Sequence, residues 1–144
     1  MIEVEAKAFV SQPDEYRKKA RALGKFKGKI KKIDDYYTLE MLDHYPKKSL
    51  RIRKIEGLYQ INFKQWISYK EGVHAKQETE FNLKEVSDFL SLIGDFGFRR
   101  WLRKEKNSEV YQIKPKFTIE LNKVKNLGWF VEVEYLVHRE REVA

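Results

Sequence analysis

Hydrophobic and polar positions alternate along most of the chain, which is the pattern of β-strands with one buried face. At the start, Ile2, Val4 and Ala6 share one face of an extended segment, and charged residues occupy the other face. The same period of two recurs in seven later segments. We therefore predict eight strands, over residues 2–7, 30–39, 49–56, 58–69, 74–81, 99–106, 110–122 and 129–137.

Two segments have the longer period of a helix. In the first, Ser11 and Asp14 have the spacing of a capping box before an apolar stripe, and Gly24 is a natural C-terminal end. In the second, residues 82–85 repeat the capping box, and an apolar face follows that ends between residues 94 and 97. An apolar stripe needs a sheet to cover, so we expect both helices to pack on the strands.

The predicted order is strand, helix and meander, repeated twice, with tight turns at Gly57 and at residues 126–128. No Pro/Gly-rich linker separates the two halves, so we expect a single domain over residues 1–144. This order predicts an α+β fold. Its core is an antiparallel eight-stranded β-barrel, closed or partly open, with two amphipathic helices on the outside.

Composition narrows the class of protein. The sequence has no cysteine, which excludes disulfides and zinc–thiolate sites, and no run of about 18 apolar residues that could span a membrane. Its first residues are acidic where a signal peptide would be basic, so we expect a cytoplasmic protein. Lys and Arg outnumber Asp and Glu by 30 to 22, which favours anionic partners.

Charges recur on one face of seven strands. On a single strand, such a row usually faces water. Here the residues between the charges are often strongly apolar, which suits an outer face covered by helices, and the charges would then point into the barrel. The signs also segregate: the strands at the two ends and the one near 117–122 are acidic, whereas those near 50–53, 60–64 and 102–106 are basic.

An acidic wall that faces a basic wall has a chemical use. Carboxylates at close range bind hard Mg²⁺ or Mn²⁺, and Arg and Lys side chains hold phosphate oxygens. A metal-bound polyphosphate would satisfy both walls. Without such a ligand, a barrel of this size would fill its interior with apolar side chains, because unpaired buried charge is expensive.

Six short motifs follow one another along these strands. They are Glu-x-Glu-x-Lys at 3–7, Asp-x-Tyr-Tyr at 34–37, Leu-Arg-x-Arg at 50–53, the strand-ending Lys64, basic-x-Glu-x-Glu at 76–80, and Leu-Gly-x-Phe-Val-Glu-x-Glu at 127–134. In this order they resemble the CYTH family over about residues 2–138. That family takes in class IV adenylyl cyclases and thiamine triphosphatases and belongs with the triphosphate tunnel metalloenzymes.

The resemblance implies a role for each matching residue. The acids that would bind Mg²⁺ or Mn²⁺ are Glu3, Glu5, Glu120, Glu132 and Glu134. The groups that would hold the triphosphate are Lys7, Arg51, Arg53, Lys64, Lys104 and Lys106, with Glu78 orienting them. Tyr36 and Lys64 could form a catalytic dyad, although Tyr36 has an equal alternative as a packed strand aromatic.

The sequence departs from the family pattern in several places. Asn122 stands where many members have Asp, and Thr38 replaces an acid. Only ten residues follow Glu134, where the family usually has another helix, so the chain is short at its C-terminal end. We therefore expect the outer face of the last strand, with Val131, Val133 and Tyr135, to be exposed and to be covered by a second subunit in a homodimer.

The resulting prediction is a metal-dependent phosphohydrolase that acts on tripolyphosphate, thiamine triphosphate or a nucleoside triphosphate. A class IV adenylyl cyclase, which converts ATP to cyclic AMP and pyrophosphate, is the first alternative. Cyclisation needs a pocket for base and sugar, and the sequence marks none; the motifs look closest to the thiamine triphosphatase branch. A non-catalytic polyphosphate- or RNA-binding module is the second alternative. The acidic pairs near both ends oppose RNA binding, and the presence of all five metal-binding acids opposes a polyphosphate binder without turnover.

Overall fold

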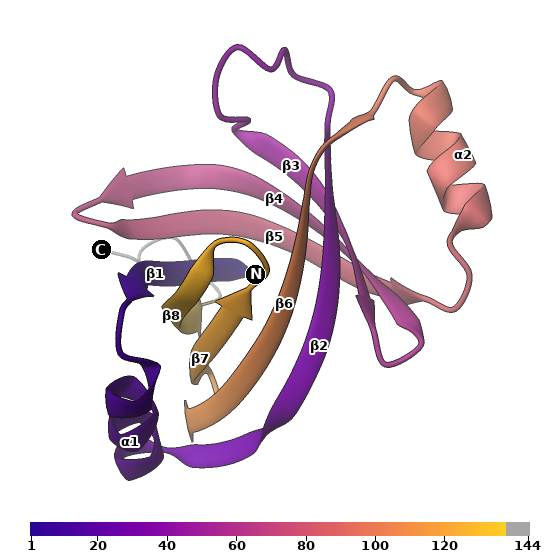
Figure 1. The fold of residues 1–144 in the computed structure, drawn as a ribbon. Helices are drawn as coiled ribbons and strands as arrows, with labels where there is room; N and C mark the ends of the chain where they lie inside the picture. Colours follow the sequence, from indigo (N-terminus) through magenta and orange to yellow (C-terminus); the bar gives the residue numbers. More distant parts are fainter. Residues whose placement is uncertain (138–144) are drawn as a thin grey trace.

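The computed structural model describes residues 1–137, and its strands form one closed antiparallel barrel (Figure 1). Around the barrel the strands follow the order β1-β5-β4-β3-β2-β6-β7-β8, and β8 pairs with β1 to close it. This confirms the predicted α+β fold. The elements are β1 (Ile2–Val10), α1 (Pro13–Leu23), β2 (Lys25–Thr38), β3 (Lys48–Ile55), β4 (Leu58–Lys70), β5 (Val73–Leu83), α2 (Ser87–Asp95), β6 (Arg99–Lys114), β7 (Phe117–Val124) and β8 (Gly128–Val137).

Two predicted strand boundaries are wrong. The strands expected over residues 99–106 and 110–122 are divided elsewhere: β6 runs unbroken to Lys114, and β7 begins at Phe117. Two polar residues in the expected gap are buried and have partners. Ser108 donates a hydrogen bond to Asn122, and Glu109 accepts two from Arg17 of α1. Polar side chains that find partners in this way do not interrupt a strand.

Both helices lie where the sequence predicted, but their first turns differ. α1 begins at Pro13 and α2 at Ser87, and neither has a side-chain hydrogen bond that caps its N-terminus. Both predicted capping boxes are therefore wrong. At the end of α1, Gly24 N–H donates to Ala20 O, as expected of a C-terminal stop. A Cβ at Gly24 would lie 2.7 Å from Gln112 O, so glycine is needed for β6 to approach the helix.

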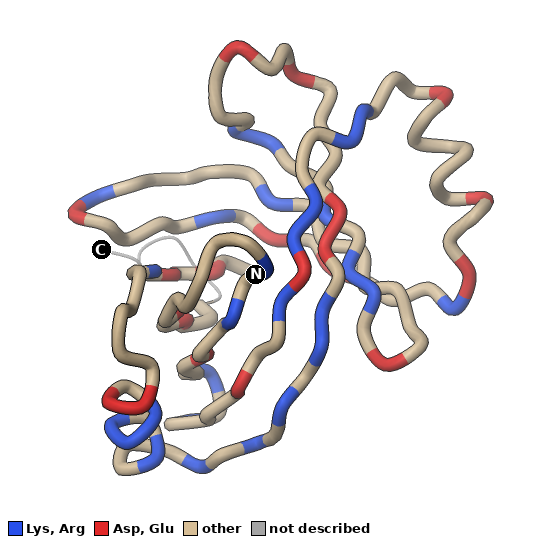
Figure 2. The backbone as a smooth tube through the Cα atoms, viewed as in Figure 1, with Lys and Arg blue, Asp and Glu red and all other residues tan. Residues whose placement is uncertain are grey.

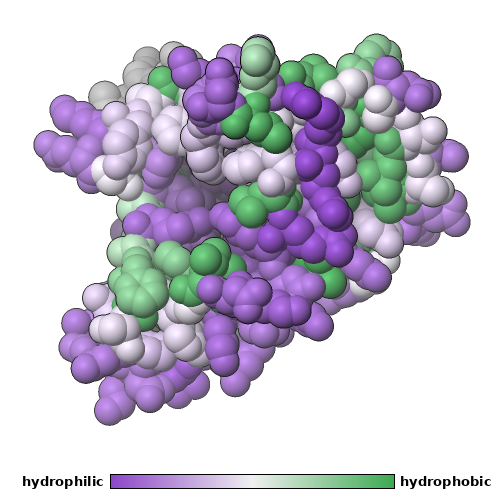
Figure 3. Space-filling view, turned by 45° about the horizontal axis from the view of Figure 1, so that its top comes forward, coloured by the Kyte–Doolittle hydropathy of each residue, from purple (hydrophilic) through white to green (hydrophobic). Residues whose placement is uncertain are grey.

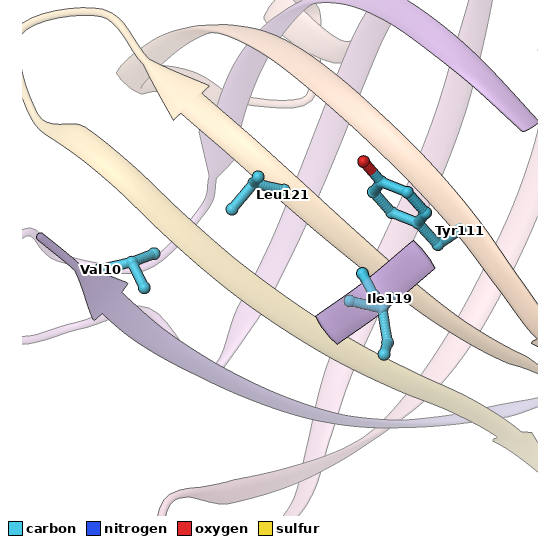
Figure 4. Close-up of a cluster of buried hydrophobic side chains, with 5 residues drawn as sticks. Val10, Tyr111, Ile119 and Leu121 are labelled. Carbon is cyan, nitrogen blue, oxygen red and sulfur yellow. The ribbon is translucent and has the colours of Figure 1, made fainter. Parts of the chain in front are cut away.

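The first apolar cluster lies between α1 and the outer face of the barrel. Ala20 of the helix packs there with side chains from three strands, and Figure 4 shows those side chains gathered on one side of the sheet: Val10, Tyr111, Ile119 and Leu121. Because strand side chains alternate between faces, residue Glu120 between two of them points the other way, into the barrel.

The second apolar cluster lies under α2. Ile93 packs against Leu50, Ile52 and Ile61 on the outer face of β3 and β4. The arginines that alternate with these residues on β3 point inward. These two apolar clusters therefore lie outside the barrel wall, beneath the helices. A third, of Ile2, Ala75 and Val137, joins β1, β5 and β8 without a helix. Among residues 1–137, no helix is long and apolar enough to cross a membrane.

The last strand is better covered than the sequence suggested. Val131 and Val133 are half-buried and pack against the cluster under α1, so the expectation that they would be exposed is wrong. Tyr135 is 43% exposed, as expected. A second subunit over this face stays a prediction, and any cover from residues 138–144 lies outside the described part of the chain.

The outer cluster gives a test of the fold. Leu121→Ala should lower the free energy of unfolding by about 2 to 5 kcal/mol, because Leu121 is 1% exposed and its truncation leaves a cavity under α1. Leu127→Ala is the matched control, since Leu127 is 57% exposed. Urea unfolding followed by circular dichroism measures both, and equal losses in the two variants would contradict this packing.

Candidate functional site

The barrel encloses a cavity of about 240 Å³ with mostly charged and polar walls. Figure 2 shows acidic and basic residues along the strands of the barrel, and Figure 3 shows a hollow with hydrophilic walls on one face of the molecule. All the residues to which the sequence analysis gave a role line this cavity. They are Glu3, Glu5, Lys7, Tyr36, Arg51, Arg53, Lys64, Glu78, Lys104, Lys106, Glu120, Glu132 and Glu134.

Three of the predicted metal ligands form an acidic cluster. Glu3 and Glu5 of β1 and Glu134 of β8 each place a carboxylate oxygen within 4.8 Å of the others. Among the described residues, the positive group closest to them is Lys64, 2.7 Å from Glu3. Burial and the nearby Glu3 raise the pKa of Glu134 well above its usual value. Lys7, the next positive group, lies 3.9 Å from Glu5, so three carboxylates face two lysines. The cluster therefore has an excess of carboxylates, and its oxygen donors suit Mg²⁺ or Mn²⁺.

The other two predicted metal ligands are paired with lysines. Lys32 Nζ lies 2.9 and 3.1 Å from the two carboxylate oxygens of Glu120. Glu132 lies 3.0 Å from Lys7 and 3.9 Å from Lys106. Burial alone would raise the pKa of Glu132, but these two lysines outweigh it, and the pKa falls. The structure therefore separates the five acids into a cluster of three, of which Glu3 pairs with Lys64, and two acids outside it that pair with Lys32 and Lys7.

On the basic wall, Asp34 holds Arg53 in place. Arg53 donates two hydrogen bonds, of 2.7 and 2.8 Å, to the two carboxylate oxygens of Asp34, and Lys106 lies 3.5 Å from the same carboxylate. Asp34 is fully buried. Burial by itself would raise the pKa of Asp34, but Arg53 more than reverses this and holds the pKa far below its usual range. Arg53 thus has a fixed orientation.

Arg51 differs from Arg53 because its charge has no partner. Arg51 is 8% exposed, has no carboxylate within 4.0 Å in residues 1–137, and its Nε makes no hydrogen bond. The hydroxyl of Ser49 is also buried without a partner. Lys76 and Lys104, on the same cavity, form no ion pair with the described residues, and burial lowers the pKa of both. These buried groups lack partners, so together they form a site that would bind an anion.

The structure brings Tyr36 and Lys64 onto one cavity without joining them. Lys64 donates to Glu3, and the described residues contain no hydrogen bond from it to Tyr36. Burial alone would raise the pKa of the Tyr36 phenol, but Lys106 and Arg51 outweigh it and lower the pKa. The catalytic dyad therefore stays a prediction.

Glu78 faces Lys64 across the β4–β5 pair and accepts a hydrogen bond from Asn62. Asn62 also donates to Glu80, over 2.9 Å, and is itself fully buried. This links two carboxylates of β5 to β4 at the level of the basic wall. Among the described residues, no ion pair joins Glu78 to Lys64, so the role of Glu78 in orienting the basic groups stays a prediction.

Several residues around the cavity are not among the site residues that were predicted from the sequence. Lys32 and Asp34 lie two residues apart on the same strand face as Tyr36, so their alternation could have identified them. Trp66 shares the face of Lys64 in the same way. Tyr45 lies in the loop before β3, where there is no period to follow, and it could not have been found.

The two departures from the family pattern have structural roles. Asn122 lies outside the cavity and is hydrogen-bonded to Ser108. Thr38 Oγ1 donates to Lys48 O and accepts from Glu40 N, which closes the base of the loop between β2 and β3. Thr38 therefore stabilises the segment that carries Tyr45 to the cavity.

Asp34 and Asp35 provide a matched pair for a test. Asp34→Asn should lower the free energy of unfolding at pH 7 by about 3 to 5 kcal/mol, because it leaves Arg53 buried without its counter-charge. Asp35→Asn should cost much less, since the partner of Asp35, Arg103, is exposed.

The pH dependence checks the same ion pair. The pKa of Asp34 is lowered in the folded state, so its stabilisation is complete above the unfolded value of about 3.9 and is lost as the pH falls further. The gap between wild type and Asp34→Asn should therefore narrow below about pH 4. Urea unfolding at a series of pH values measures it, and a gap that is constant down to pH 2 would contradict the pairing.

Comparison with known proteins finds one family that matches the sequence and several solved structures with a similar fold. The CYTH domain model matches residues 1–144. The PH1012 protein of Pyrococcus horikoshii is 29% identical, with a TM-score of 0.78, over 97% of this chain and 82% of that chain. The PH1819 protein of the same organism is 28% identical, with a TM-score of 0.80, over 98% and 81%.

A more distant structure shares the fold alone. HpAC1 of Hippeastrum, which has a dominant triphosphatase activity, is 16% identical with a TM-score of 0.68, over 98% of this chain and 82% of that one. No curated protein matches the sequence. With the family model matching its whole length, the chain belongs to the CYTH domain family.

Proposed function

We propose that this protein is a metal-dependent phosphohydrolase that cleaves a triphosphate bound in the barrel cavity. The observation that supports it best is the charge imbalance of that cavity. Arg51, Lys76 and Lys104 form no ion pair with the described residues. The three carboxylates of Glu3, Glu5 and Glu134 exceed the positive groups beside them, which are Lys64, 2.7 Å from Glu3, and Lys7, 3.9 Å from Glu5. A polyphosphate that carries a divalent cation would supply both missing charges at once.

The residues divide into two groups by what they would hold. Glu3, Glu5 and Glu134 would hold the cation, which would align the phosphate chain and neutralise part of its charge. Arg51 and Lys104 would hold phosphate oxygens.

Arg53 would add a rigid fork, because Asp34 already fixes its orientation. Phosphoryl transfer asks for little more than this positioning and charge neutralisation.

Tyr36 and Lys64 would act where charge develops. Burial opposes the charge of Lys64, but Glu3 raises its pKa and keeps the ammonium protonated beside the acidic cluster. Tyr36, whose pKa Lys106 and Arg51 lower, would donate a strong hydrogen bond to a phosphate oxygen or to the attacking water. The proposed dyad therefore consists of two side chains that act on the same substrate without a hydrogen bond between them in residues 1–137.

Cyclisation of ATP remains the second candidate because of one structural feature. The sequence marks no pocket for base and sugar, yet an aromatic-lined cavity adjoins the charged one. A panel of tripolyphosphate, ATP, GTP and thiamine triphosphate with Mg²⁺ or Mn²⁺, with products separated by chromatography, tests the proposal. Release of phosphate supports hydrolysis; cyclic AMP and pyrophosphate without ADP or free phosphate would replace it with cyclisation.

The two arginines of β3 should respond differently to truncation. Arg51→Met should leave the empty protein at least as stable as wild type, because it removes a buried charge that has no partner. It should weaken tripolyphosphate binding about 30-fold or more. Arg53→Met should lower both affinity and stability, since it leaves Asp34 unpaired.

Calorimetric titration and urea unfolding measure the two effects separately. Unchanged tripolyphosphate affinity together with a larger stability loss in Arg51→Met than in Arg53→Met would show that Arg51 has a structural role instead.

Metal removal gives a further test. Excess EDTA should abolish triphosphate hydrolysis, and added Mg²⁺ should restore it. Glu134→Gln should weaken Mn²⁺ binding, followed by electron paramagnetic resonance without substrate, because the cluster loses one of its three carboxylates. Glu15→Gln, on the exposed face of α1, is the control. Full turnover in EDTA would refute the metal requirement.

A further inference from the structure

A second cavity, of about 520 Å³, opens beside the charged one at its mouth. We call it the mouth cavity. The two cavities share Lys7, Lys76 and Lys104 on their walls, so a phosphate chain in the first could continue into the second. The two cavities overlap, because Tyr45 and Trp66 also line both, and His74 lines the mouth cavity alone. These aromatic side chains form the wall at the mouth, and they come from the loop between β2 and β3 and from the ends of β4 and β5. Its volume falls in the range of ordinary small-molecule sites.

Trp66 is the centre of the aromatic wall. Its ring centroid lies 6.1 Å from that of Tyr45 and 4.8 Å from that of His74, which meets it edge-on at 88°. The backbone N–H of Trp66 also donates a hydrogen bond of 3.2 Å to the backbone carbonyl of Lys47, which joins β4 to the loop. A β-bulge follows between Trp66 and Ser68. Bulges often redirect a side chain next to a functional site, and this one directly follows a residue that lines the mouth cavity.

The charges around the mouth cavity select the kind of ring that fits. Lys47, Lys76 and Lys104 line it without a carboxylate partner in residues 1–137. Glu5, its one acidic residue, already lies in the acidic cluster. Lys76 Nζ lies over the Trp66 ring, 5.4 Å from its centroid, so this ring already makes a cation–π contact. A positively charged ring would be repelled, whereas an uncharged aromatic ring can stack.

We infer that the mouth cavity binds an uncharged aromatic ring joined to the triphosphate, as in a nucleoside triphosphate, stacked against Trp66 and Tyr45. This inference rests on the proposed triphosphate site and specifies its substrate. The inference ranks a nucleoside triphosphate above thiamine triphosphate, in which the thiazolium ring carries a positive charge. A nucleoside triphosphate also ranks above tripolyphosphate, which has no ring to stack on the aromatic wall.

The test compares ligands with and without a ring. Dissociation constants for the β,γ-imido analogue of ATP and for tripolyphosphate, measured by calorimetry with Mg²⁺, should change differently in Trp66→Ala. The analogue should bind about tenfold more weakly, while tripolyphosphate stays within about twofold. Trp66→Phe should restore most of the loss. Trp129→Phe is the matched control, because Trp129 packs with Arg17 away from both cavities.

Each outcome decides between the inference and the proposed function. Equal losses for both ligands in Trp66→Ala, or no loss for either, would overturn the ring site and leave the triphosphate site standing. Failure of wild type to bind either ligand would overturn both. Binding of tripolyphosphate without binding of the analogue would overturn the ring site alone.

Charge selection has its own test. Displacement of the imido analogue measures the affinity of thiamine triphosphate, which should be the weaker ligand of wild type. Lys47→Glu should shift the ratio of the two affinities several-fold toward thiamine triphosphate. Lys48→Glu should not shift it, because Lys48 does not line the mouth cavity. Tighter binding of thiamine triphosphate than of the analogue by wild type would overturn the inference.

Discussion

Charged groups buried in the wall of a barrel need partners there, because burial removes much of the water that would screen them, and the rest of the structure depends on this constraint. Asp34 balances Arg53, Lys32 balances Glu120, and Lys7 balances Glu132. These pairs fix three parts of the wall. What remains unbalanced is an excess of positive groups around Arg51 and an excess of carboxylates around Glu134. The site is therefore the part of the interior that the protein leaves unneutralised.

A polar interior also decides where the apolar core can lie. With the inward positions taken by charges, the outward positions of the same strands carry the hydrophobic residues, and they need cover. α1 and α2 supply it through Ala20 and Ile93, each the one fully buried residue of its helix. The ion pair of Arg17 with Glu109 adds a polar tie between α1 and β6. Core and site are thus opposite faces of the same strands, and one alternation of residues encodes both.

That alternation explains how much the sequence predicts. It assigns each strand residue to a face, so the barrel and the lining residues follow from it, Arg51 and Glu132 among them. It does not say which inward charges meet, because partners come from strands distant in sequence: Lys32 and Glu120 belong to β2 and β7. The predicted gap between strands around Ser108 is wrong for the same reason, since the partner of Ser108 lies on another strand. Loop residues such as Tyr45 follow no period at all.

The mouth cavity bears on the choice between hydrolysis and cyclisation. With a ring in it, the α-phosphate would lie where the two cavities join, and cyclisation would need a proton acceptor there for the ribose hydroxyl. Glu5 is the only carboxylate common to both cavities in the described part of the chain, and it already belongs to the acidic cluster. Hydrolysis needs no group at that junction, because water can react farther along the phosphate chain, near Arg51. Recognition of a ring is therefore compatible with a hydrolase, in which the ring serves to select the substrate.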